Sequence, residues 1–242
     1  MSESPSLSMD VFIQAKQDLT LYAPAAMMSG EFNNTDFDPA MYAQKAIYYP
    51  PSMVRASRKR QAEYFVGRYL ADQAMSHFGV NQFKLLADAK RCPQWPKTLV
   101  GSITHTDNYA ACITAEKSEI SALGIDAQDI LNEERAERLQ SRIIDSAESR
   151  LISESSLSAA LGLSLCFSAK ESIYKGLYPQ IQQYFGFNAA KLHTIDSDNN
   201  ILSFRFDPAL HVLHNDRNIL DIRYHIDDQR VLTCLMLHVK KR

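Results

Sequence analysis

A cluster of basic residues, Arg58, Lys59 and Arg60, stands at the predicted start of a helix within SRKRQAEYFVGR, residues 57–68. The first turn of a helix has free backbone amides and the positive end of the helix dipole, which together favour a bound anion. A phosphate group would be attracted by the side chains and by the backbone. The alternative is that these residues extend their charged ends from a solvated helix face.

His105 lies in the turn of a predicted hairpin, between residues 100–104 and 109–115. An imidazole at a hairpin tip can reach into a cleft and donate a hydrogen bond to a phosphate. It can equally be an exposed turn histidine that bonds to Thr106 or Asp107. The other six histidines have no metal-ligand spacing, and the chain has neither G-x-S-x-G nor a Walker loop. Zinc hydrolases, common serine hydrolases and nucleotide triphosphatases are therefore disfavoured.

Oxygen-bearing side chains alternate in GIDAQD, residues 124–129. On a strand, alternate side chains share a face, so Asp126 and Gln128 point one way while Ile125 and Ala127 point the other. Two oxygen-bearing groups then face one space. The same pattern arises where a strand leaves the core and turns its polar residues to solvent, so this segment alone does not establish a site.

Charged residues also interrupt an apolar helix pattern in FSAKESIYK, residues 167–175. Glu171 and Lys175 are four positions apart and could form an ordinary surface ion pair. Ser168 and Glu171 also have the spacing of a capping box, but Ser168 is expected inside the helix, where it has no free amide to cap. The ion-pair interpretation stays open.

Composition places the chain among ordinary globular proteins. Of its 242 residues, 45% are hydrophobic and 22% are charged, and the formal charge is −2, which argues against a nucleic-acid-binding protein and confines any basic site to a local patch. The four cysteines are dispersed, no run of about 18 apolar residues occurs, and the first residues lack the pattern of a signal peptide. We expect a cytoplasmic protein with reduced cysteines and no transmembrane segment.

The elements that must position these residues follow from periodicity. Residues 1–57 are predicted to be an irregular arm with a few short strands or turns, because Pro24, Pro39, Pro50 and Pro51 interrupt short mixed segments. Helices are predicted at 58–78, 133–150 and 156–178, the last ended by Pro179. Strands are predicted at 100–104, 109–115, 120–130, 201–207, 220–227 and 230–239.

A helix followed by strands thus occurs twice. This duplication predicts an α+β protein of two similar halves, residues 1–118 and 119–242, each a long helix packed on a small antiparallel sheet. Ligands often bind where two such halves meet. The residue identities themselves contain no detectable internal repeat.

Four motifs in order carry a resemblance to a known family: R-K-R-x-A-E-x-x-x-G-R, W-P-x-x-x-x-G-S-I-T-H-T, G-I-D and F-S-A-K-E-S-x-Y-K. Together they resemble the 4′-phosphopantetheinyl transferases, specifically the component D type attached to enterobactin and related siderophore synthetases. The resemblance runs from about Phe37 to the last strand. It implies a pseudo-twofold fold with coenzyme A bound between the halves.

The resemblance also implies roles for individual residues. Asp126 and Glu171, with Gln128, would be magnesium ligands, and Glu171, Lys170 and Lys175 would be the catalytic residues. Glu171 is the preferred general base for the carrier serine. The implied contacts to coenzyme A and its phosphates are Arg58, Arg60, Arg68, Arg91, Thr104, His105, Lys170 and Lys175.

Position 128 departs from the family pattern. Many members have a carboxylate two residues after the G-I-D aspartate, whereas this chain has Gln128. An amide oxygen can ligate magnesium or hold a ligating water, but it contributes less charge. We therefore expect weaker metal affinity with activity retained.

The implied partner is an apo carrier protein whose surface is usually acidic. Arg135, Arg138 and Arg142 fall on one helical face and could dock it, or they could be a solvated face paired with Glu134 and Glu137. The halves of the site belong to one chain, so we expect a monomer.

Other functions remain open at this stage. The chain could be a non-catalytic coenzyme A binding relative in which Gln128 has impaired the metal site, or a scaffold without a ligand. If it is an enzyme, polyketide or polyunsaturated fatty acid synthase carriers compete with siderophore synthetases as its partners.

Overall fold

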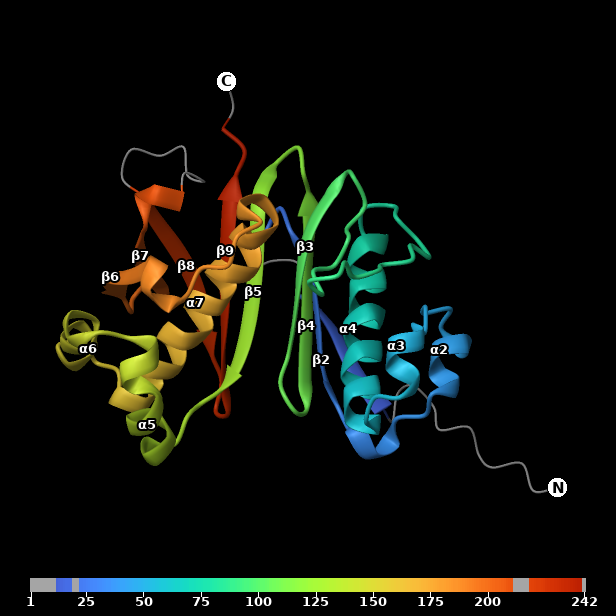
Figure 1. Ribbon diagram of the computed structural model, residues 1–242, viewed down its shortest axis with the longest axis horizontal. Helices are drawn as coiled ribbons and strands as arrows, with labels where there is room; N and C mark the ends of the chain where they lie inside the picture. The colour runs from blue at the N-terminus through green and yellow to red at the C-terminus, as the bar shows by residue number, and fades with distance from the viewer. Residues whose placement is uncertain (1–11, 19–21, 211–217, 241–242) are drawn as a thin grey trace. The chain divides into compact units, whose positions relative to one another are not determined.

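The computed structural model describes residues 12–18, 22–210 and 218–240. The chain forms two compact units, residues 1–119 and 120–242. Each contains a long helix packed on an antiparallel sheet, so the predicted α+β class is confirmed (Figure 1). The roles predicted for the two halves stay predictions.

The first unit is a four-stranded antiparallel sheet covered by one long helix (Figure 1). Its strands, in the spatial order β1-β2-β4-β3, are β1 (Ile13–Asp18), β2 (Ala26–Phe32), β3 (Leu99–His105) and β4 (Tyr109–Glu116). Its helices are α2 (Ala40–Gln44), α3 (Pro51–Val54) and α4 (Arg58–Ser76), with a 3₁₀ turn at Asn34–Asp36. The predicted hairpin of residues 100–104 and 109–115 is confirmed as β3 and β4.

Helix α4 begins where the sequence predicted. The Ser57 hydroxyl caps it by accepting a hydrogen bond from the Arg60 amide at 3.2 Å. Phe65, Val66 and Leu70 are fully buried and pack the helix onto the sheet. The helix ends at Ser76, two residues before the predicted end, and Gly79 follows with a φ of +73°, a left-handed conformation that favours glycine.

The N-terminal arm is more regular than expected, because β2 lies inside the sheet between β1 and β4. Its sequence, AMMSGEF, has no β-branched residue, so local propensity gave little signal for a strand. Neighbouring strands determine its conformation instead. Gly30 makes this possible, since a Cβ there would lie 2.7 Å from the Gln14 carbonyl oxygen on β1.

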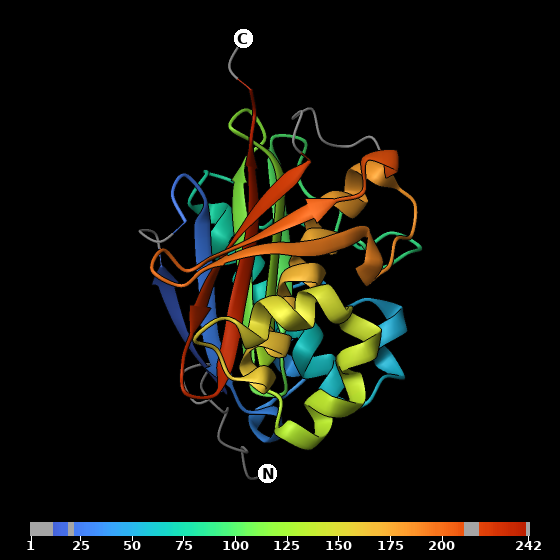
Figure 2. The same ribbon diagram turned by 90° about the vertical axis from the view of Figure 1, so that its left-hand side faces the viewer.

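The second unit is a five-stranded antiparallel sheet of order β5-β9-β8-β7-β6. Its strands are β5 (Ile120–Asp129), β6 (Ala190–Asp196), β7 (Ile201–Phe206), β8 (Ile219–Ile226) and β9 (Arg230–His238). Its helices are α5 (Glu133–Ile143), α6 (Ser146–Ser153) and α7 (Ala159–Ile181), with 3₁₀ turns at Phe187–Ala189 and Pro208–Leu210. Figure 2 shows α5 and α6 beside α7.

The prediction of one helix over 133–150 was wrong, because the helix is interrupted at Ile144 and Asp145. Ile144 is extended, with φ −128° and ψ 154°, and Asp145 starts α6. The Asp145 carboxylate accepts from the Glu148 amide at 3.0 Å, and the Glu148 carboxylate accepts from the Asp145 amide at 2.9 Å. This reciprocal capping box satisfies free amides that a continuous helix would not have.

Two further details differ from the predictions. Helix α7 starts at Ala159, capped by Ser158, and it continues past Pro179 to Ile181. Pro179 lies in the last turn, and the helix closes at Gln182, whose φ is +55° and whose amide donates to the Tyr178 carbonyl at 2.8 Å. Strand β6 was not predicted, since this edge strand mixes polar and apolar residues without a clear alternation.

Helix α7 lies unusually close to β5, and this contact positions the candidate site. A Cβ on Gly124 would lie 2.0 Å from the Ser172 carbonyl oxygen and 2.7 Å from the Gly176 amide nitrogen. Buried hydroxyls join the elements: Ser168 donates to the Asp126 carbonyl at 3.1 Å, and Ser172 donates to the Thr233 carbonyl on β9 at 2.9 Å. The glycine and serines of the two motifs thus bring their acidic residues together.

Gly124→Ala is predicted to force α7 away from β5. Because the clash involves backbone atoms, we expect a loss of about 3 kcal/mol in the free energy of unfolding, measured by urea denaturation. Gly186→Ala is the matched control for stability, since the nearest atom to its added Cβ would be 4.0 Å away. Equal stability of the two variants would refute this account of the helix–strand contact.

Candidate active site

The second unit brings together three of the predicted site residues, one from β5 and two from α7. The Asp126 carboxylate accepts from the Lys175 ammonium, with Oδ1 and Nζ 2.6 Å apart. Both side chains are largely but not wholly buried, with 10% and 28% of their surface exposed. Lys175 thus forms an ion pair between helix and strand, whereas the sequence had left open a surface pair with Glu171.

Glu171 is half-buried beside this pair. Burial raises the pKa of its carboxyl most, the negative charge of Asp126 raises it further, and the Lys175 ammonium lowers it. When two carboxyl groups lie this close in their effect, ionising one makes it harder to ionise the other unless a cation lies near. Lys175 supplies one such positive charge in this structure.

These oxygens suit a hard divalent cation. Magnesium prefers oxygen ligands and is commonly held by one or two carboxylates together with substrate phosphates and water. Within the described ranges no cluster of three or more histidine, cysteine, aspartate or glutamate side chains could hold a metal. Gln128 lies farther toward solvent, and its amide nitrogen donates to the Asp129 carbonyl at 2.8 Å.

Lys170 lies in a different environment from Lys175. Its ammonium is 1% exposed, 2.7 Å from Glu148 Oε1 and 2.7 Å from the Ile143 carbonyl oxygen. Burial lowers the pKa of this ammonium, and the Glu148 carboxylate offsets part of that effect. Glu148 is also fully buried and accepts the Leu192 amide at 2.8 Å. These contacts fasten α7 to α5, α6 and β6.

A pocket of about 150 Å³ opens beside Glu171. Its wall is mainly aromatic, with Tyr174 at 6.0 Å from Tyr184 and 5.0 Å from Phe185 between ring centroids. Tyr184 is 77% exposed, which is high for a large side chain. The lining residues are Lys170, Glu171, Tyr174, Tyr184, Phe185, Gly186, Phe187 and Ala190.

The first unit brings two predicted phosphate contacts together. Arg60 on α4 and His105 at the end of β3 approach to 3.3 Å between Nη1 and Nε2. Glu63, one turn along α4, lies beside both, with Oε2 3.2 Å from Arg60 Nη1 and 3.9 Å from His105 Nε2. The turn after His105 is held by Asp107, which pairs with Lys59 at 2.5 Å.

The other predicted contacts to coenzyme A do not join this group. Arg58 donates to the Phe37 carbonyl from Nε, at 3.0 Å, and from Nη2. Thr104 is buried, and because successive side chains of a strand point to opposite faces, it faces away from His105. Arg91 is exposed, with a φ of +68°. Their predicted roles stay predictions.

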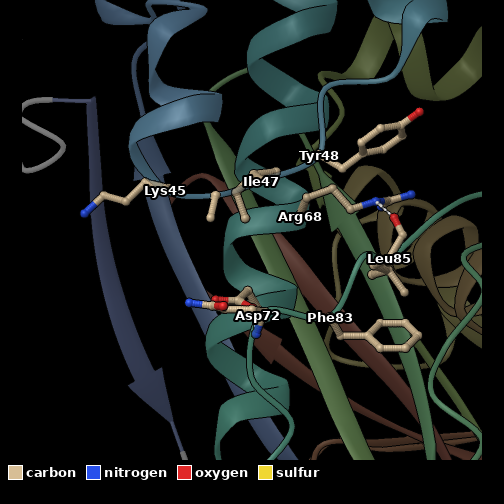
Figure 3. Close-up of a pocket in the computed structure, with 9 residues that line it drawn as sticks. Lys45, Ile47, Tyr48, Arg68, Asp72, Phe83 and Leu85 are labelled. Carbon is tan, nitrogen blue, oxygen red and sulfur yellow. Dashed lines mark hydrogen bonds between the residues drawn. The ribbon is translucent and has the colours of Figure 1, made fainter.

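Arg68 lies two turns beyond Arg60, beside a second pocket that Figure 3 shows. Its Nε donates to the Leu85 carbonyl at 3.0 Å, and its guanidinium stacks over Tyr64 at 4.6 Å from the ring centroid. The space is about 20 Å³, which holds about one water molecule. A larger ligand there would require the lining side chains to move.

Arg135, Arg138 and Arg142 are all exposed on α5, which leaves both interpretations of that face open. The four cysteines are free, and three of them are buried. Among the residues that the structure describes, no helix has the length and apolar character needed to cross a bilayer.

Sequence reasoning missed several residues of these environments. Glu148 had a detectable local signal, since Asp145-x-x-Glu148 has the spacing of a capping box, but its pairing with Lys170 depends on tertiary contacts. Tyr184 and Phe185 follow the end of α7 in a segment without regular pattern. Glu63 belonged to a quoted motif, yet nothing in the sequence distinguished it from a surface glutamate.

Comparisons with known proteins identify the class. Residues 50–115 match the 4′-phosphopantetheinyl transferase N-terminal domain, and residues 122–234 match the 4′-phosphopantetheinyl transferase superfamily. Enterobactin synthase component D of Salmonella typhi is 33% identical over 74% of this chain and 75% of its own length. The Escherichia coli protein of the same name is 31% identical, over 63% and 72%.

A third relative comes from another group of bacteria. The 4′-phosphopantetheinyl transferase PptT of Mycobacterium tuberculosis is 29% identical over 64% of this chain and 67% of its own length. These matches and the α+β fold define a transferase. The chain belongs to the 4′-phosphopantetheinyl transferase superfamily, as the sequence motifs indicated.

Removing one partner of the buried Glu148–Lys170 pair is predicted to be costly. Glu148→Ala leaves a buried ammonium without its carboxylate, so we expect the free energy of unfolding to fall by about 3–5 kcal/mol. The double variant Glu148→Leu with Lys170→Met should recover part of that loss, because both charges are gone while the Asp145 and Leu192 amides lose their acceptor. Urea denaturation measures both effects.

Glu154→Ala is the matched control on the same helix, since it breaks the exposed pair with Arg150 at 2.7 Å. An exposed pair contributes at most about 1 kcal/mol. If Glu148→Ala cost no more than Glu154→Ala, the buried pair would not hold α7 in place.

Proposed function

We propose that this chain transfers the 4′-phosphopantetheine arm of coenzyme A to a serine hydroxyl of an apo carrier protein and releases adenosine 3′,5′-bisphosphate. The observation that carries the proposal is the convergence of Asp126, Glu171 and Lys175 from β5 and α7. Two acidic groups and one cation, with Glu171 in the wall of a pocket, suit chemistry on a pyrophosphate. The family to which the chain belongs performs this transfer.

Asp126 and Glu171 are the residues that would hold magnesium, with Gln128 nearby at the same strand end. Burial and the neighbouring Asp126 carboxylate both raise the pKa of Glu171. This supports the assignment, because a bound divalent cation would offset the repulsion between the two carboxylates. When bound, the metal neutralises negative charge on the pyrophosphate of coenzyme A. Lys175 is the side chain of this chain that would pair with a phosphate oxygen once it leaves Asp126.

Glu171 is our candidate for the general base. A carboxylate whose pKa is raised binds a proton more strongly than an ordinary glutamate, which suits acceptance of the serine proton. A carboxylate that also ligates a metal is a weaker base. The serine proton would reach Glu171 either directly or through a water. Lys170 is not assigned a direct contact in this proposal, because Glu148 and the Ile143 carbonyl surround its ammonium.

The binding roles are divided between the units. In the first unit, Arg60 and His105 are proposed to hold a phosphate of coenzyme A, supported by their 3.3 Å approach. In the second, the aromatic pocket beside Glu171 is proposed to take part of the pantetheine arm, whose amides and methyl groups match an apolar wall with polar tips.

We propose a siderophore synthetase as the source of the carrier, supported by the names of the Salmonella and Escherichia relatives. Polyketide and polyunsaturated fatty acid synthase carriers are the competing partners. A cytoplasmic monomer is part of the same proposal, in keeping with the four free cysteines.

Glu171→Gln is predicted to change stability with pH and magnesium. The pKa of Glu171 is raised in the folded protein above its ordinary value of about 4, so ionising this carboxyl destabilises the folded state. The destabilisation is absent below the ordinary pKa and reaches its full size above the raised pKa. Without metal, the variant should therefore melt higher than wild type at pH 8 and equally at pH 4. Adding magnesium to the coenzyme A complex should raise the melting temperature of wild type by several further degrees, and this additional rise should be absent in the variant.

Glu137→Gln removes an exposed glutamate from α5 and serves as control. It should follow wild type in both respects. A magnesium-dependent shift of equal size in Glu171→Gln and wild type would rule out Glu171 as a metal ligand.

The proposed reaction is tested by weighing a carrier domain. Purified chain, coenzyme A, magnesium and an apo carrier from a siderophore synthetase are incubated, and the carrier is analysed by mass spectrometry. We expect a mass gain equal to the phosphopantetheine arm, with a rate at least ~100-fold lower for Glu171→Gln. No gain on any of the three carrier classes, despite coenzyme A binding in calorimetry, would identify a non-catalytic binder. No gain and no binding would indicate a scaffold.

A further inference from the structure

The cluster of Arg60, Glu63 and His105 contains an acidic group where the proposed function requires anion binding. The Glu63 side chain is 11% exposed, whereas those of Arg60 and His105 are 42% and 32% exposed. The two basic groups are therefore open to a ligand, while the acid lies behind them. This arrangement differs from a surface ion pair, in which both partners are solvated.

The contact between Arg60 and His105 constrains the imidazole. A guanidinium can only donate, so at 3.3 Å from Arg60 Nη1 a neutral His105 must accept through Nε2 and carry its proton on Nδ1. In that form Nε2 has no proton to offer a phosphate, and Nδ1–H is the remaining donor of the ring. If His105 instead carries both protons, it donates well, but two cations then lie side by side and repel each other.

Glu63 removes this conflict. Its Oε2 lies 3.2 Å from Arg60 Nη1 and 3.9 Å from His105 Nε2, so one carboxylate attracts both groups. Glu63 lies inside α4, one turn from Arg60 and directly after the buried Ala62. Nearby Lys59 is paired with Asp107 and so does not compete for Glu63 in this arrangement.

We propose that Glu63 is a positioning residue for coenzyme A binding: its carboxylate holds the Arg60 guanidinium and the His105 imidazole side by side so that both can contact one phosphate. The inference rests on the proposed function for its ligand. Glu63 does not itself contact the phosphate, because a carboxylate has no proton to donate and repels an anion.

The test compares Glu63→Gln, Glu63→Asp and wild type. Glutamine keeps the shape and one acceptor oxygen but loses the charge, so we expect the dissociation constant of coenzyme A in calorimetry, and the KM for coenzyme A, to rise roughly tenfold. The kcat should stay within about twofold, since the chemistry at Glu171 is untouched. Aspartate restores the charge and should recover part of the affinity.

Glu116→Gln is the matched control, because Glu116 is exposed at the other end of the β3–β4 hairpin, opposite Leu99. Unchanged or tighter binding of coenzyme A by Glu63→Gln would overturn the inference, since Glu63 would then be neutral or a competitor of the phosphate. An equal fall in kcat and affinity, with a lower melting temperature, would also overturn it in favour of a purely structural role. Binding is measured without a carrier, so a failed transfer reaction leaves this test intact.

Discussion

The close packing of α7 on β5 is the constraint on which the rest of the second unit depends. Gly124 and Gly176 let the helix and strand backbones approach, the Ser168 hydroxyl donates to the Asp126 carbonyl on β5, and the Ser172 hydroxyl donates to the Thr233 carbonyl on the neighbouring β9. Burial raises the pKa of the Glu171 carboxyl most, and the negative charge of Asp126, brought near by this packing, raises it further. Packing free energy thus holds together charges that would otherwise separate, as is common where function requires a locally unfavourable arrangement.

The two lysines of the K-E-S-x-Y-K motif illustrate how the same residue type serves different ends. Lys175 remains partly exposed and pairs with Asp126, so its ammonium can move to a ligand. Lys170 is enclosed by Glu148 and the Ile143 carbonyl. If its ammonium moved away, the buried Glu148 carboxylate would lose its positive partner. The motif therefore predicts that both lysines lie near the site. Their burial distinguishes Lys175, which is partly exposed, from Lys170, which is enclosed.

Sequence reasoning succeeded where the signal was local and strong. The long helices, the β3–β4 hairpin and the last three strands follow from periodicity, and the family follows from the order of motifs. It failed where tertiary contacts decide: β2 has poor strand propensity and is imposed by β1 and β4, and the break at Asp145 depends on a capping box inside a helical pattern. Likewise, the pairing of Glu148 with Lys170 and of Glu63 with Arg60 and His105 cannot be distinguished from surface charges without coordinates.

The central claim, that Asp126 and Glu171 share one divalent cation, is tested most directly by anomalous diffraction from a crystal grown with coenzyme A and manganese in place of magnesium. The account predicts a single strong anomalous peak at about 2.0–2.3 Å from carboxylate oxygens of both residues, close to magnesium–oxygen distances. A manganese peak bound elsewhere, or bound to one carboxylate with the other turned away from it, would contradict the claim.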